Sequence, residues 1–266
     1  MTNLLDPVPG WAIMLGSALL IFAMSEVGFR LGLKKGPGLG SQDPSAVVQA
    51  TAFTVLALLL GFSFALALSR FDARRGTLVR EANAIGTTYL RAQLLDAPTA
   101  TAVRGDLRLY VAQRLAFAQA DADPEQRART DRQSDVIQGD LWKLAMQAAR
   151  REPRSTVVPL YIVALNDTID LSAEQRAILS THIPDIVIIG LLLIALIASA
   201  MMGYGFGRQG QRAIVFEALF AVMLAIAIGL ILDLDRPQRG LIRVNLAPLQ
   251  TLQQVISSGA TSPNQR

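Results

Sequence analysis

The stretch Leu58–Arg75, LLLGFSFALALSRFDARR, joins an uncharged apolar run to a basic segment without an intervening proline. Lipid offers no hydrogen-bond partner to backbone N–H and C=O groups, so an apolar run inside a membrane has to be helical. No turn signal follows Ser69, and the apolar residues beyond it continue to recur at three- and four-residue steps. This stretch therefore predicts a membrane-spanning helix that continues without a break into a soluble helical segment.

Three further apolar blocks are long enough to cross a hydrocarbon layer about 30 Å thick, which takes roughly 20 helical residues. With the block just described, the predicted spans cover about residues 11–33, 46–69, 185–207 and 213–232. The composition agrees, because 52% of the residues are hydrophobic and only 17% are charged. The sequence predicts an all-α integral membrane protein with four transmembrane helices.

These spans divide the chain into four parts. We expect an N-terminal transmembrane hairpin, a helical segment between the second and third spans, a C-terminal transmembrane hairpin and a tail, covering residues 1–69, 70–184, 185–232 and 233–266. Within the helical segment, Pro98 and Asp123 are typical of helix starts. A helix is expected over Thr156–Ile169, and Ser172 with Gln175 has the pattern of a capping box that opens another short helix.

The distribution of basic residues predicts the topology. Four spans place both termini and the 70–184 segment on one side of the membrane, where eight Lys and Arg residues lie close to span ends, against four on the opposite side. Basic residues near span ends favour the cytoplasm. We therefore expect a cytoplasmic helical segment and cytoplasmic termini.

Several function classes lack the residues that they need. The chain has no cysteine and a single histidine, His182, which excludes thiol chemistry and multi-histidine metal sites. No phosphate-binding loop, nucleophile elbow or zinc-binding helix motif occurs, so we expect no enzyme activity, cofactor or metal. The basic residues are spread along the chain rather than clustered beside aromatics, which favours contact with lipid headgroups of the bilayer over nucleic-acid binding.

Charged residues inside predicted spans are costly and usually have a partner or line a water path. Glu26 and Arg30 have the i, i+4 spacing of a helix ion pair, which competes with a role in permeation. Glu217 lies one turn inside the fourth span, where it either reaches the headgroups or meets a buried partner. The glycine-rich run 202–207, MGYGFG, is interpreted as a close-packed helix end rather than a selectivity filter.

The second span offers a candidate pore lining. Phe62, Leu66 and Ser69 share one face of the predicted helix, so a ring of such helices would form an apolar neck. Arg70, Arg74 and Arg75 follow directly and would place positive charge in a vestibule below it. The alternative is that any one of these side chains packs against lipid or protein.

The segment Gly61–Gly86 resembles the pore helix of bestrophin channels, where an apolar neck precedes an arginine and a Glu-Ala pair, here Glu81-Ala82. The stretch Leu232–Gly240, LDLDRPQRG, leading to Ala247–Leu252, APLQTL, is similar to the acidic-proline element and following helix of that family. The chain is most similar to the bacterial bestrophin-like domain family. The candidate residues in the acidic-proline element are Asp233, Asp235 and Pro237.

The resemblance implies a homopentamer in the bacterial inner membrane, with inorganic ions passing through one axial pore. Its neck would be formed either by Phe62 and Leu66 or by Ala65 and Ser69, and the arginines below it favour anions. A rival interpretation is a membrane-anchored scaffold or sensor whose cytoplasmic helices bind a protein partner. A scaffold could be monomeric or dimeric, whereas a channel of this kind has to be oligomeric.

Overall fold

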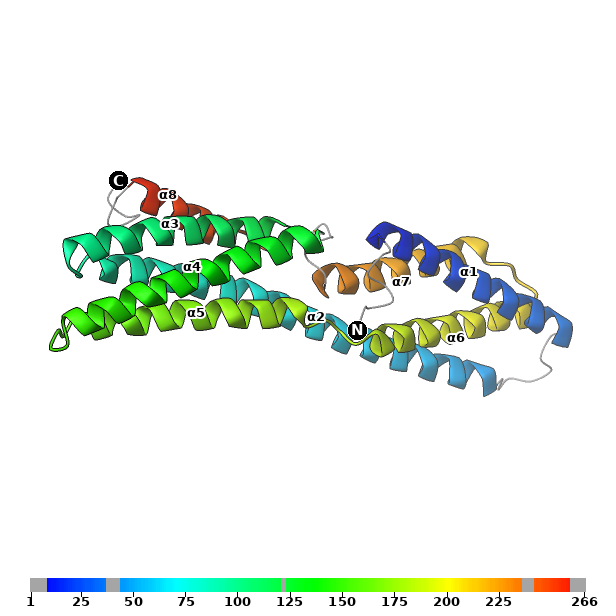
Figure 1. The fold of residues 1–266 in the computed structure, drawn as a ribbon. Coiled ribbons are helices and arrows are strands. Elements are labelled where there is room, and N and C mark those ends of the chain that lie inside the picture. The colour runs from blue at the N-terminus through cyan, green and yellow to red at the C-terminus, as the bar shows by residue number, and fades with distance from the viewer. Residues whose placement is uncertain (1–8, 37–43, 121–122, 236–241, 259–266) are drawn as a thin grey trace. The chain divides into compact units, whose positions relative to one another are not determined.

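The computed structural model describes residues 9–36, 44–120, 123–235 and 242–258 (Figure 1). Within these ranges the secondary structure is helical and contains no strand, which confirms the all-α prediction. The helices are α1 (Gly10–Lys35), α2 (Pro44–Ala92), α3 (Ala97–Gln119), α4 (Pro124–Arg151), α5 (Val158–Ser180), α6 (Asp185–Gln209), α7 (Ile214–Asp235) and α8 (Ala247–Ser258).

The helices form two compact units. The first unit consists of Met1–Phe71 and His182–Ile242, and the second of Asp72–Thr181 and Arg243–Arg266. The helix α2 has 49 residues and contributes to both units, since it runs unbroken from the apolar block into the polar segment. The predicted continuation of the second span beyond Ser69 is therefore confirmed.

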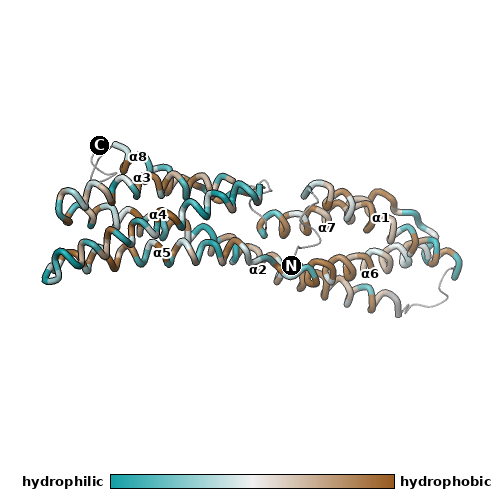
Figure 2. The backbone as a smooth tube through the Cα atoms, viewed as in Figure 1, coloured by the Kyte–Doolittle hydropathy of each residue, from teal (hydrophilic) through white to brown (hydrophobic). Residues whose placement is uncertain are grey.

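The first unit contains the membrane-spanning helices. Figure 2 shows that α1, α6 and α7 are hydrophobic over most of their length. The helical stretches long and apolar enough to cross a membrane are Gly10–Lys35, Ala46–Ala92, Val158–Gln209 and Ile214–Asp235, of which the third includes both α5 and α6. Their shared core includes Ile21 on α1, Leu56 on α2, Leu191 on α6 and Ile228 on α7.

Within this unit, α1 and α6 approach so closely that only glycine fits at the contact. A methyl group at Gly28 would lie 1.9 Å from the carbonyl oxygen of Ala200, and one at Gly203 would lie 1.9 Å from that of Ser25. Small residues let membrane helices bring their backbones together in this way. The glycine-rich run that ends α6 is thus a close-packed helix end, as its sequence suggested.

The second unit is a bundle of capped helices around its own apolar core. The carboxylate of Asp123 accepts hydrogen bonds from the backbone N–H groups of Glu125 and Gln126, and Asp96 caps α3 through the N–H of Thr99. Such caps satisfy donors that the first helical turn leaves open. The buried core joins Ile85 on α2, Leu107 on α3, Leu141 on α4, Leu165 on α5 and Leu249 on α8.

One boundary prediction is wrong. The sequence suggested that a helix ends at Ile169 and that Ser172 opens another, but α5 continues through both residues to Ser180. The hydroxyl of Ser172 donates to the carbonyl of Ile169 and accepts from the side chain of Gln138 on α4. The hydroxyl of Ser172 therefore bonds to a neighbouring helix instead of capping the start of a new one.

Candidate ion pathway and its surroundings

The side of α2 that packs inside the first unit is narrow. Leu56, Ser63 and Ala67 are buried and recur at seven- and four-residue steps along one face. Phe62 and Leu66, by contrast, are 63% and 41% exposed, and Ser69 is exposed one turn further on. The three candidate neck residues therefore project away from the packing of their own chain and are available to contact water, lipid or another subunit.

A second exposed surface of α2 lies on the other side of the helix. Phe64 and Leu68 are 42% and 41% exposed. Each residue of an α-helix advances about 100° around the axis, so Phe64 and Leu68 point about 200° away from Phe62 and Leu66. The helix thus offers two pairs of residues of the same types in opposite directions, with the two leucines equally exposed.

The three arginines after the apolar run have different surroundings. Arg74 is buried, and its Nη2 donates a 2.9 Å hydrogen bond to the backbone carbonyl of Thr181. Arg75 is exposed and Arg70 is half-buried. Arg74 thus ties α2 to the end of α5, while Arg70 and Arg75 retain access to solvent.

The charged residues at the α6–α7 end of the first unit form a small ion-pair group. Nε of Arg30 lies 2.8 Å from Oε1 of Glu26, the pair expected from their spacing. Nη2 of Arg212 lies 2.9 Å from the second carboxylate oxygen of Glu26. Because Glu26 holds two guanidinium groups from separate segments, it links α1 to the connection before α7.

Glu217 lies in the interior of the first unit, with only 2% of its surface exposed. Its Oε2 accepts a 2.9 Å hydrogen bond from the hydroxyl of Ser25 on α1. The sequence left open whether Glu217 reaches the headgroups or meets a buried partner, and the structure places it against that partner.

The carboxylates of the acidic-proline element accept backbone hydrogen bonds. Both oxygens of Asp235 accept from the N–H of Ile183, at 3.0 and 3.1 Å, and Oδ2 of Asp233 accepts from the N–H of Ile242 at 2.9 Å. Pro237 lies outside the described residues, as do Arg236 and Arg239. Over the described ranges, His, Asp and Glu form no cluster of three or more with the geometry of a metal site.

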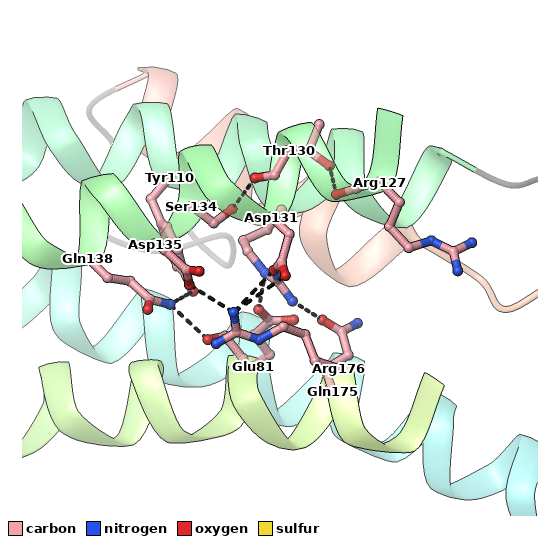
Figure 3. Close-up of polar contacts among 12 residues, drawn as sticks. Glu81, Tyr110, Arg127, Thr130, Asp131, Ser134, Asp135, Gln138, Gln175 and Arg176 are labelled. Carbon is pink, nitrogen blue, oxygen red and sulfur yellow. Dashed lines mark hydrogen bonds and ion pairs between the residues drawn. The ribbon is translucent and has the colours of Figure 1, made fainter. Parts of the chain in front are cut away.

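A buried charge network in the second unit did not emerge from the sequence (Figure 3). Nε of Arg114 lies 2.5 Å from Oε1 of Glu81, and both side chains are completely buried. Arg114 also donates to Gln175 and lies 3.8 Å from Asp131. The sequence did contain a sign that Arg114 is buried, because Arg114 falls on the same face of α3 as the apolar residues from Val103 to Leu115.

The chain has the fold of solved bestrophin homologues. A variant of the bacterial bestrophin homologue from Klebsiella pneumoniae matches with a TM-score of 0.69 and 13% identity, covering 92% of this chain and 98% of that one. Two further structures of the Klebsiella pneumoniae homologue give TM-scores of 0.63 and 0.65, with 15% and 14% identity. They cover 93% and 92% of this chain and 98% and 97% of the respective homologue chains.

Comparison at the level of sequence finds fewer matches than comparison of structures. No curated protein matches the chain. The family model of the bestrophin-like domain, however, matches residues 34–249, which include α2 to α7 and the start of α8. This match covers most of the sequence and agrees with both the membrane helices and the fold, so the chain belongs to the bestrophin-like domain family.

Proposed function

We propose that this membrane protein is an oligomeric ion channel in which copies of α2 surround a central pore. The observation that carries the proposal is the exposed stripe of Phe62, Leu66 and Ser69 at the end of the apolar part of α2. Assembly around an axis at this stripe would bury apolar side chains and leave a narrow passage between them. Membership of the bestrophin-like family supports the same arrangement, with five copies by resemblance.

The chemistry of the stripe supports a gating mechanism. A ring of Phe62 and Leu66 side chains offers no hydrogen bonds to water, so the passage dewets when narrow and excludes hydrated ions. A modest increase in radius lets water enter, and conduction begins. Ser69 follows one turn later and supplies the first hydroxyls that can solvate an ion leaving the neck.

Charge near the neck supports a preference for anions. Arg70 and Arg75 retain solvent access, and repeated positive groups around a pore raise the local concentration of anions. Arg74 is occupied by its bond to Thr181 and makes a structural contact. The bias of basic residues towards the helical segment supports cytoplasmic termini. The similarity to a bacterial bestrophin homologue supports a location in the bacterial inner membrane.

Two measurements test this proposal on the full-length protein. Light scattering of the detergent-solubilised protein, with the detergent contribution subtracted, should give the mass of about five 28.6 kDa chains. Reconstituted liposomes should show ion flux that changes in Phe62→Ala and Leu66→Ala, because each substitution widens the neck. Chloride and potassium gradients imposed separately then measure the preference for anions.

The variants Phe64→Ala and Leu68→Ala are matched controls, since they remove the same side chains from the opposite side of α2. Their flux should stay close to that of the unmodified protein when the assembly mass is unchanged. A monomer or dimer without flux in any variant would contradict the channel and favour a scaffold whose helical unit binds a protein partner.

A further inference from the structure

The buried network in the second unit connects four helices (Figure 3). Arg114 on α3 lies between Glu81 on α2 and Asp131 on α4, at 2.5 and 3.8 Å. Arg176 on α5 contacts Asp131 at 3.4 Å and Asp135 at 2.8 Å. The connected ion pairs therefore contain three carboxylates and two guanidinium groups.

Three other titratable groups on these helices have partners of their own. Tyr110 on α3 accepts a hydrogen bond from Gln138, and Arg80 on α2 pairs with Glu174 on α5 at the surface. The guanidinium of Arg127 on α4 lies over the ring of Phe117, 6.0 Å from its centroid.

The three carboxylates differ sharply in their access to water. Asp131 and Asp135 have 27% and 52% of their side chains exposed, so water can solvate their negative charge. The side chain of Glu81 is fully buried. Its Oε2 has no hydrogen-bond partner in the described part of the chain. An isolated buried anionic oxygen is far more unfavourable than a buried neutral hydroxyl.

We propose that Glu81 is a buried proton-binding site that carries one dissociable proton on Oε2 in the folded helical unit. In this state its carbonyl oxygen, Oε1, still accepts the hydrogen bond from Nε of Arg114. The charge of Arg114 is then matched by Asp131, and that of Arg176 by Asp135. Ionisation of Glu81 releases the proton and leaves a buried carboxylate that competes with the partly exposed Asp131 for the guanidinium of Arg114.

The titration of neighbouring groups agrees with this assignment. Burial raises the pKa of Glu81 from its ordinary value of 4.5, although the nearby Arg114 opposes the shift. Burial also raises the pKa of Tyr110, which keeps that phenol neutral. Partial burial lowers the pKa of Arg176, but hydrogen bonds to Asp135 and Asp131 outweigh it and raise the pKa, which keeps the guanidinium charged.

The proton on Glu81 links the packing of the helical unit to pH. A folded-state pKa above the unfolded one means that the folded unit binds the proton more tightly. Its stabilising contribution is complete below pH 4.5, the ordinary glutamate value, and is lost as the pH rises through the folded-state pKa. The contact of α2 with α3 is therefore expected to loosen as the pH rises.

Infrared spectroscopy of the full-length protein in detergent tests the site directly. At a pH above the ordinary glutamate value of 4.5 and below the folded-state pKa of Glu81, the unmodified protein should show the carbonyl stretch of a protonated carboxyl group, and Glu81→Gln should lose it. Glu174→Gln is the matched control, because it makes the same change at a partly exposed glutamate on a neighbouring helix. In that pH range, a band of undiminished intensity in Glu81→Gln, or no band in the unmodified protein, would overturn the proposal.

A second variant keeps the site testable if Glu81→Gln does not fold. Glu217 is the other buried glutamate in the described chain, and it belongs to the membrane unit. In Glu217→Gln protein labelled with carbon-13 glutamate, a protonated-glutamate band that persists above pH 4.5 and disappears as the pH rises further can then be assigned to Glu81. Without such a band, Glu81 is ionised and the proposal fails.

Discussion

The close contact between α1 and α6 makes Gly203→Ala a sharp test of how the membrane unit is packed. The added methyl group would lie 1.9 Å from the carbonyl oxygen of Ser25 and 2.7 Å from its carbonyl carbon. Ordinary contacts begin at 3.4 Å, so the two backbones have to separate by about 1.5 Å. Neither contact atom belongs to a flexible side chain, which leaves no local rotation to relieve the clash.

Overpacking of this kind typically destabilises a protein by about 1–3 kcal/mol. We expect Gly203→Ala to lie near the upper end, about 3 kcal/mol, because the clash is with backbone. The assay is unfolding of the purified protein in mixed micelles as the fraction of denaturing detergent is raised, followed by circular dichroism and by elution volume. The variant should unfold at a clearly lower denaturant fraction.

Gly190→Ala on the same helix is the matched control. A methyl group there meets no atom within 4 Å, so its unfolding curve should overlie that of the unmodified protein. If Gly203→Ala and Gly190→Ala unfold at the same denaturant fraction, the described approach of α1 to α6 is incorrect.

Two further predictions concern the helical unit. Arg114→Met leaves the carboxylate of Glu81 without its partner and should destabilise the unit by about 3–5 kcal/mol at a pH where Glu81 is ionised. In denaturant titrations, the double variant Arg114→Met with Glu81→Leu should recover most of that loss, and failure to recover it would argue against the pairing. Asp123→Ala removes the acceptor that caps α4 and should lower stability by about 1 kcal/mol, measured in the same way, whereas Asp123→Asn should retain most of the cap.

Features set by local sequence were predictable. The apolar blocks identify the membrane helices because only helices satisfy backbone hydrogen bonds in lipid. The cap at Asp123 follows from a short side chain before the first helical turn, and the uninterrupted run after Ser69 predicted that α2 continues. The Glu26–Arg30 pair also depends only on residues one turn apart.

Features set by contacts between distant segments were not predictable in the same way. Ser172 resembles a helix cap locally, but its bond with Gln138 is made to another helix, and α5 continues past it. The sequence treated Arg70, Arg74 and Arg75 as equivalent vestibule charges, whereas in the structure Arg74 bonds to the carbonyl of Thr181. The Glu81–Arg114 pair joins residues of two helices whose facing surfaces no local pattern specifies.

The most direct test of the central claim uses the absence of cysteine from the sequence. A single cysteine introduced as Leu66→Cys or Leu68→Cys is the only thiol in the protein, and the two positions have equal exposure but opposite directions on α2. A charged, water-soluble thiol reagent should block ion flux through Leu66→Cys channels and leave Leu68→Cys channels conducting. Block at Leu68→Cys with no effect at Leu66→Cys would contradict a pore lined by Phe62, Leu66 and Ser69.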